Sequence, residues 1–243
     1  VCAVTATYST IINLPPTNGG YTISYQRCCR NPNITNVVNP ADVGFTLTCR
    51  VPGVGGNNYI NNSPRFSNYP PLLLCNNEDL IFDHSATDPD GDQLVYSLIT
   101  PFSGATGTAP APNPAPPPPY FNINWMGGFS APNPLGPGAS ISINPNTGLL
   151  TASPNLTGRF VVGVQVQEIR GGVVINRTMR DFVFQVFNCV IQMQAILPTQ
   201  EQLQGFTSFC DGLSIDFENN TVFNGTPPPG SNYAWDFGVS GIN

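Results

Sequence analysis

The acidic residues of this chain are concentrated in one short segment. Six of the fourteen aspartates and glutamates fall within positions 78–92. Crowded carboxylates raise one another's pKa unless a cation neutralises them. Asp88, Asp90 and Asp92 stand at alternate positions, and Gly91 permits a tight backbone bend. Calcium takes roughly six to eight oxygen ligands. The segment therefore predicts a calcium site on these three aspartates, with Asp83 as a weaker candidate ligand.

The same segment allows two other interpretations: a turn without a metal, which remains open, and a hydrolase active site, which is weaker. Pro-Asp-Gly is an ideal β-turn sequence, so "TDPDGDQ" could form a turn that binds no metal. A hydrolase would have to use the single histidine, His84, between Asp83 and Ser85. Neighbours along a strand point to opposite faces, so His84 shares a face with neither. Two carboxylates across a cleft, as a glycosidase needs, are not indicated either. We expect no enzyme, and we expect His84 at the surface or flanking a strand.

Composition favours an all-β, secreted protein. Only 9% of the residues are charged, there is no lysine, and Gly and Pro number 24 and 26. A hydrophobic content of 40% is enough for packed cores. The net charge of −6 excludes a nucleic-acid partner, because phosphates need neutralising cations. No apolar run is long enough to span a membrane, so we expect no membrane-embedded segment.

Seven cysteines without a C-x-x-C pair favour disulfides in an oxidising compartment. The candidates are Cys2, Cys28, Cys29, Cys49, Cys75, Cys189 and Cys210. The odd number leaves a free thiol or a partner elsewhere. Cys28 and Cys29, as neighbours on a strand, would join different bridges, and Cys189 with Cys210 is the most plausible local bridge. Arg27 and Arg30 flank the Cys pair and are expected to cap carbonyls or pair with Asp42 at the surface.

Short alternating segments between Gly, Pro and Asn clusters predict β-sandwich domains. We expect three: residues 1–70, residues 71–188 with a Pro-rich loop at 101–119, and an incomplete domain at 189–243. The clearest element is a hairpin in which residues 160–166 and 182–186 alternate about a Gly171-Gly172 turn. One helical turn could form at 198–206. The chain begins at Val1 and ends within an expected strand, which suggests a segment of a longer or processed chain.

An aromatic group lies among Pro-rich and Gly-rich loops. It comprises Tyr120, Phe121, Trp125 and Phe129. Tyr120, Trp125 and Phe129 could contact a ligand as a sugar-stacking platform. The other interpretation is sandwich core with a loop packed over it.

Two stretches resemble known domains. "SATDPDGDQLVYSL", "INPNTGLLTASP" and "VVGVQVQE" together resemble the bacterial cadherin-like domain. "FCDGLSIDFENNT" and "YAWDFG" resemble the start of a PKD domain, through Tyr233, Trp235, Asp236, Phe237 and Gly238. Val239 stands where that family has Asp, which speaks against a metal in that loop. The cadherin-like resemblance implies metal ligation by Asp88, Asp90 and Asp92, and makes Glu168 a further candidate. The implied architecture is a tandem of Ig-like, cadherin-like and PKD-like β-sandwiches.

The longer pattern is more specific. "GYTISYQRCCRN", "SPRFSNYPPLLLCNNEDLIFDHSATDPDGD" and "GRFVVGVQVQEIRGG" resemble the large gliding-motility surface adhesins of Bacteroidota. This resemblance implies type IX secretion, extracellular or cell-surface display and adhesion. We therefore expect a non-enzymatic adhesin or structural segment, stiffened by disulfides and calcium. Its partners would be a surface polysaccharide or another cell-surface ligand, with self-association into a filament also open. The competing interpretation is a carbohydrate-binding or spacer module of a secreted polysaccharide-degrading enzyme.

Overall fold

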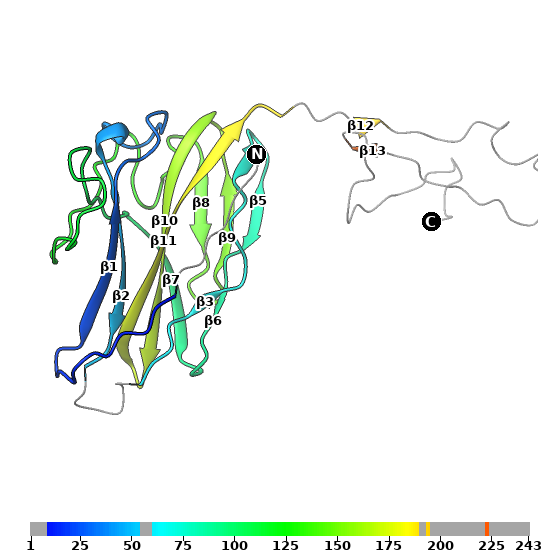
Figure 1. Ribbon diagram of the computed structural model, residues 1–243. Helices are drawn as coiled ribbons and strands as arrows, with labels where there is room; N and C mark the ends of the chain where they lie inside the picture. The colour runs from blue at the N-terminus through cyan, green and yellow to red at the C-terminus, as the bar shows by residue number, and fades with distance from the viewer. Residues whose placement is uncertain (1–8, 54–59, 190–192, 195–221, 224–243) are drawn as a thin grey trace, which may run out of the picture. The chain divides into compact units, whose positions relative to one another are not determined.

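The computed structural model describes residues 9–53, 60–189, 193–194 and 222–223 (Figure 1). Residues 1–188 form one compact unit and residues 189–243 form a second. In the second unit, β12 (Met193–Gln194) pairs with β13 (Val222–Phe223) in antiparallel fashion. The rest of the expected PKD-like domain, including Tyr233 to Gly238, and the helical turn expected at 198–206 lie outside the described residues.

The first unit is built on a four-stranded sheet in the order β4-β11-β10-β7. Its strands are β4 (Leu73–Cys75), β7 (Gln93–Ile99), β10 (Gly158–Arg170) and β11 (Val173–Phe187). The predicted hairpin is confirmed: Phe160 lies opposite Phe184 and Val162 opposite Phe182. Gly171 and Gly172 have φ of 59° and 80°. A two-residue hairpin turn of this kind needs positive φ at both positions, which glycine adopts without steric cost.

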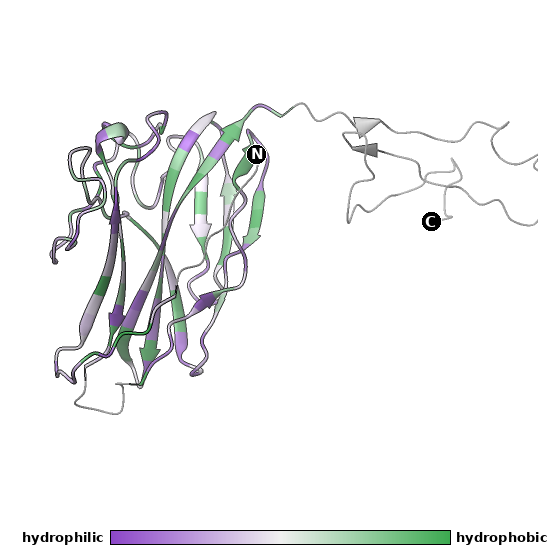
Figure 2. Cartoon of the chain, viewed as in Figure 1, coloured by the Kyte–Doolittle hydropathy of each residue, from purple (hydrophilic) through white to green (hydrophobic). Residues whose placement is uncertain are grey.

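The central strand β10 is buried on both faces. Phe160, Val162 and Val164 pack with Leu150 and Ile141 of a second sheet, whose order is β5-β9-β8. The strands of that sheet are β5 (Leu80–Asp83), β8 (Ser140–Ile143) and β9 (Leu149–Ser153). The unit is therefore an all-β sandwich, with apolar residues on the strands of both sheets (Figure 2). Burial on two faces explains why this stretch of β10 is almost continuously apolar.

The opposite face of β10 is covered by the N-terminal part of the chain. Val161 packs against Ile34, Val37 and Ile123. Asn36 is fully buried. Its side chain accepts a hydrogen bond from the Val161 N–H at 3.0 Å and donates one to the Val161 carbonyl at 2.9 Å. An antiparallel ribbon of β1 (Tyr21–Arg27) and β2 (Phe45–Val51), joined through η1 (Pro40–Asp42), lies against β11 through β2. The ranges expected as two domains, 1–70 and 71–188, thus contribute to one unit.

Arg30 joins this N-terminal part to the central sheet. It is buried and forms two hydrogen bonds with the carboxylate of Asp181 on β11, at 2.9 and 2.5 Å. Its Nε and Nη2 also donate hydrogen bonds to the carbonyls of Gly44 and Phe102, respectively. Of the two roles expected for Arg30, carbonyl capping is confirmed, whereas the surface pairing with Asp42 is wrong. The acidic partner of Arg30 is instead Asp181, a largely buried aspartate that is distant in sequence.

The loop at 101–119 carries no strand and lies beside the β1–β2 ribbon. Thr46 donates a hydrogen bond from Oγ1 to the Ser103 carbonyl at 2.7 Å, and the Cys28 N–H donates to the Pro110 carbonyl at 2.9 Å.

The described residues include no helix long and apolar enough to cross a membrane.

The cysteines differ in part from the expectation. β1 ends at Arg27, so Cys28 and Cys29 do not lie on a strand, and they are bonded to each other rather than to different partners. Cys75 and Cys189 are also disulfide-bonded. Cys49 is a free thiol, 3.3 Å from the Ser63 hydroxyl, so its prediction as a disulfide partner is wrong. Cys2 and Cys210, and with Cys210 the expected Cys189–Cys210 bridge, lie outside the described residues.

His84 follows β5 directly, but it is not at the surface. Its ring is fully buried among Phe66, Phe82 and Phe182, with centroid distances of 5.1, 5.5 and 5.5 Å. Neither ring nitrogen has a hydrogen-bond partner among the residues that the structure describes. Burial, with a smaller contribution from the charge of Arg180, lowers the pKa of His84 to about 4. The histidine is thus part of the aromatic packing between β5 and β11.

Candidate metal centre

The acidic turn, residues 88–92, connects β6 (Ala86–Thr87) to β7, and its conformation is set by Asp88. Oδ1 of Asp88 accepts hydrogen bonds from the backbone N–H groups of Asp90 and Asp92, at 2.9 and 3.1 Å. Gly91 has a φ of 78°, which a residue with a Cβ rarely adopts. Pairing of β6 with β3 (Arg65–Phe66) anchors the start of the turn. The turn and the carboxylate cluster predicted from this segment are therefore one feature.

Glu168 reaches the acidic turn from β10. It lies opposite Leu94 on β7 and Asn176 on β11, next to a β-bulge between Glu168 and Ile169. Its side chain is fully buried, and Oε2 accepts a hydrogen bond from Asn176 Nδ2 at 3.2 Å. Oε1 has no partner. Burial raises the pKa of Glu168 above its usual range, because the charged form loses its hydration.

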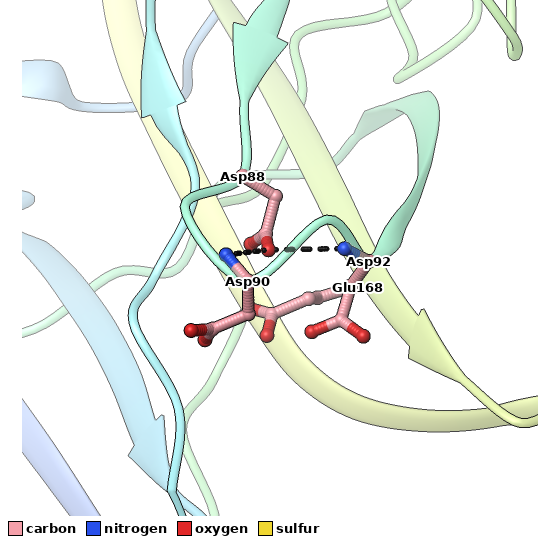
Figure 3. A group of neighbouring side chains, drawn as sticks. All are labelled: Asp88, Asp90, Asp92 and Glu168. Carbon is pink, nitrogen blue, oxygen red and sulfur yellow. Dashed lines mark hydrogen bonds between the residues drawn. The ribbon is translucent and has the colours of Figure 1, made fainter.

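The four carboxylates converge. Asp88, Asp90, Asp92 and Glu168 each offer an oxygen, and these oxygens lie within 4.8 Å of one another (Figure 3). Oδ2 of Asp88 and Oε1 of Glu168 are both buried, and neither has a hydrogen-bond partner in the part of the chain that the structure describes. A buried carboxylate oxygen without a partner is costly unless a cation binds it. This group of acids could therefore hold a metal ion, and every ligand atom that it offers is a carboxylate oxygen.

Arg170 is the cation that faces the cluster in the structure. Its Nε and Nη2 donate to the two oxygens of Asp92, at 2.8 and 2.5 Å, and Nη2 lies 3.4 Å from Asp90 Oδ2. The hydrogen bond from Arg170 is the main reason that the pKa of Asp92 is lowered. Within the described residues one guanidinium faces four carboxylates, so the cluster keeps an excess of negative charge that a divalent cation would reduce.

Asp90 and Arg170 also form hydrogen bonds with the segment at residues 60–63. Asn62 donates from its backbone N–H to Asp90 Oδ2 at 2.6 Å and from Nδ2 to Oδ1 at 2.8 Å. These bonds lower the pKa of Asp90. Arg170 donates to the Ile60 carbonyl and to Asn61 Oδ1, at 2.9 and 3.0 Å. The cluster therefore joins the acidic turn, β10 and the 60–63 segment.

Asp83, the fifth predicted ligand, is not part of the cluster. Its carboxylate accepts one hydrogen bond from the Ser85 N–H at 3.0 Å and another from Asn68 Nδ2 at 3.3 Å. Sequence reasoning did not find Arg170, Asn62 or Asn176. Arg170 could have been found, because it stands two positions after Glu168 on the same predicted strand. Asn62 and Asn176 carry no comparable signal.

The aromatic residues expected as ligand contacts are not assembled into one surface. Trp125 packs against the core cluster that contains Val161, and its Nε1 donates to Thr100 Oγ1 at 3.1 Å. Phe129 packs on the other core, 6.0 Å from the ring of Phe160. Tyr120 contacts Phe102, with a centroid distance of 5.7 Å. Their positions agree with the interpretation as core and loop packing.

Comparison with protein-family models, curated proteins and solved structures gave no match.

Proposed function

We propose that this chain is a calcium-braced structural segment of an extracellular adhesin. The observation that carries the proposal is the fully buried Glu168, whose carboxylate converges with three aspartates and whose Oε1 has no hydrogen-bond partner within the described ranges. A site that served only to make a turn would not need a buried carboxylate from β10, because burying a charge is costly. A cation accounts for its position and for the unpaired oxygen of Asp88.

Calcium fits this ligand set better than other common metals. Zinc prefers nitrogen and sulfur ligands, and the cluster contains neither His nor Cys. Magnesium usually binds through one or two carboxylates and keeps several waters. Calcium accepts several carboxylates in a flexible geometry. An oxidising extracellular compartment, which the disulfides favour, is also one where calcium is abundant.

The role of the ion would be mechanical. It would neutralise the repulsion within the acidic turn and tie that turn to β10 and to the 60–63 segment. Together with the disulfides and the absence of lysine, this suits a rigid, protease-resistant segment. The resemblance to type IX-secreted gliding-motility adhesins supports cell-surface display and, by repetition of such segments, a filament. The segment itself would perform no catalysis.

We expect calcium to raise the melting temperature of the chain. At a calcium concentration about tenfold above its Kd, binding stabilises the folded state by roughly 1.4 kcal/mol. For a unit of this size that corresponds to about 3–6 °C. Thermal melts in millimolar calcium and in EDTA measure the shift.

Two substitutions separate the metal site from its surroundings. Glu168→Gln keeps the shape of the side chain and should abolish most of the calcium shift, while its melting temperature in EDTA should not fall, because a buried charge is removed. Asp83→Asn is the matched control outside the cluster and should keep the full shift. An equal calcium shift in the wild type and in Glu168→Gln would contradict the proposed brace.

A further inference from the structure

A groove of about 540 Å³ lies beside the candidate metal centre. Its lining comes from three places: Asp88 and Asp92 of the acidic turn, Gln93 at the start of β7, and the turn between β8 and β9 with Asn146 and Thr147. That turn is held near the acidic turn, because the Tyr96 N–H of β7 donates to the Pro145 carbonyl at 2.9 Å. Two of the four metal-binding carboxylates thus face a space large enough for a small ligand.

The candidate ion would have free coordination positions. Asp88 uses Oδ1 for the backbone of its own turn and leaves Oδ2 for a metal. Glu168 leaves Oε1, since Asn176 binds Oε2. Both carboxylate oxygens of Asp90 accept hydrogen bonds from Asn62, and both of Asp92 accept hydrogen bonds from Arg170. This favours a single metal contact from each of the two aspartates. Four oxygens leave about two to four of calcium's positions for other ligands.

The rest of the groove is polar and uncharged. Besides the two aspartates its polar lining consists of hydroxyl and amide side chains: Ser85, Thr87, Gln93, Tyr96, Asn146 and Thr147. It contains no arginine. The four carboxylates outweigh Arg170 and a divalent cation by one negative charge, so an anionic ligand would be repelled. The exposed amide of Asn146 makes no side-chain hydrogen bond within the described part of the chain and is available to a ligand.

We propose that this groove binds a neutral carbohydrate through two adjacent hydroxyl groups. The hydroxyl oxygens complete the coordination of the calcium ion, and neighbouring hydroxyls exchange hydrogen bonds with Asn146 and Gln93. The ligand class follows from the free metal positions, the neutral polar lining and the excess negative charge. This inference rests on the calcium site proposed above, and it assigns the adhesive contact of the segment to that site rather than to Trp125.

The test uses the full chain and a panel of immobilised neutral polysaccharides: dextran, mannan, galactan and xylan. We expect binding to at least one of them in millimolar calcium, reduced at least about tenfold by EGTA. Periodate oxidation of the polysaccharide should cause a similar loss, because it cleaves bonds between adjacent hydroxyl-bearing carbons. The double variant Gln93→Ala with Asn146→Ala should lose binding but keep the calcium shift in melting temperature. Asn124→Ala, an exposed amide outside the groove, is the control.

The outcomes separate the two proposals. A calcium shift in melting temperature without binding to any panel member would overturn the carbohydrate site and leave the brace intact. Binding that persists in EGTA, after periodate treatment or in the double variant would also overturn it. Absence of the calcium shift in the wild type would overturn both.

Discussion

Replacing Arg30 with alanine is expected to lower the free energy of unfolding by about 3–5 kcal/mol. The guanidinium is buried and satisfies both oxygens of Asp181, whose side chain is only 9% exposed. Its removal leaves an uncompensated charge on β11, inside the unit. It also leaves the carbonyls of Gly44 and Phe102 without this donor. Urea unfolding followed by tryptophan fluorescence measures the loss.

A second variant separates the charge effect from packing. Arg30→Met combined with Asp181→Leu removes both charges and fills similar volume, so it should recover much of the stability that Arg30→Ala loses. If Arg30→Ala unfolds at the same urea concentration as the wild type, the N-terminal part of the chain is not docked on β11 as described. Arg27, the exposed arginine before the Cys pair, is the matched control: Arg27→Ala should change stability little.

Acidification is expected to destabilise the protein through His84 by about 3 kcal/mol between pH 6.5 and pH 4. The unfolded chain protonates this histidine near its usual pKa of 6.5, whereas burial lowers the pKa in the folded state to about 4. The unfolded state therefore binds more protons in this window, and stability falls as the pH falls. Above pH 6.5 His84 makes no pH-dependent contribution, and below pH 4 it adds no further loss.

The groups that face His84 support this direction. Three phenylalanine rings enclose it, the charge of Arg180 disfavours a second cation, and Asp83 opposes that effect weakly. Because carboxylates also titrate in this range, the measurement is a comparison: stability against pH for the wild type and for His84→Phe. The variant should lose the part of the pH dependence between pH 6.5 and pH 4 that His84 causes. Parallel curves for the two proteins would show that His84 is not buried.

The parts of the molecule that follow from local pattern were predictable. The alternation of apolar residues and two adjacent glycines predicted the β10–β11 hairpin, and three aspartates at alternate positions predicted most of the carboxylate cluster. Asp83 belongs to the same acidic stretch, but it lies before the turn, where Ser85 and Asn68 bind its carboxylate. Sequence proximity alone could not distinguish it from Asp88.

The remaining features depend on contacts between distant segments. Arg30 and Asp181 are 151 positions apart, so nothing near Arg30 indicates that its partner is not Asp42. Asn62 meets Asp90 only because β3 pairs with β6. The bond between Cys28 and Cys29 depends on where β1 ends, since on a strand the two side chains would point apart. Burial of His84 follows from the packing of β5 against β11, which neither segment encodes alone.

Calcium binding by the four converging carboxylates is the central claim, and calorimetric titration of the EDTA-treated full chain tests it most directly. The wild type and Asp83→Asn should bind the same number of calcium ions, and Glu168→Gln should bind one fewer, because it removes the buried ligand without removing the turn. Identical isotherms for the wild type and Glu168→Gln, or no calcium binding by the wild type, would contradict the account.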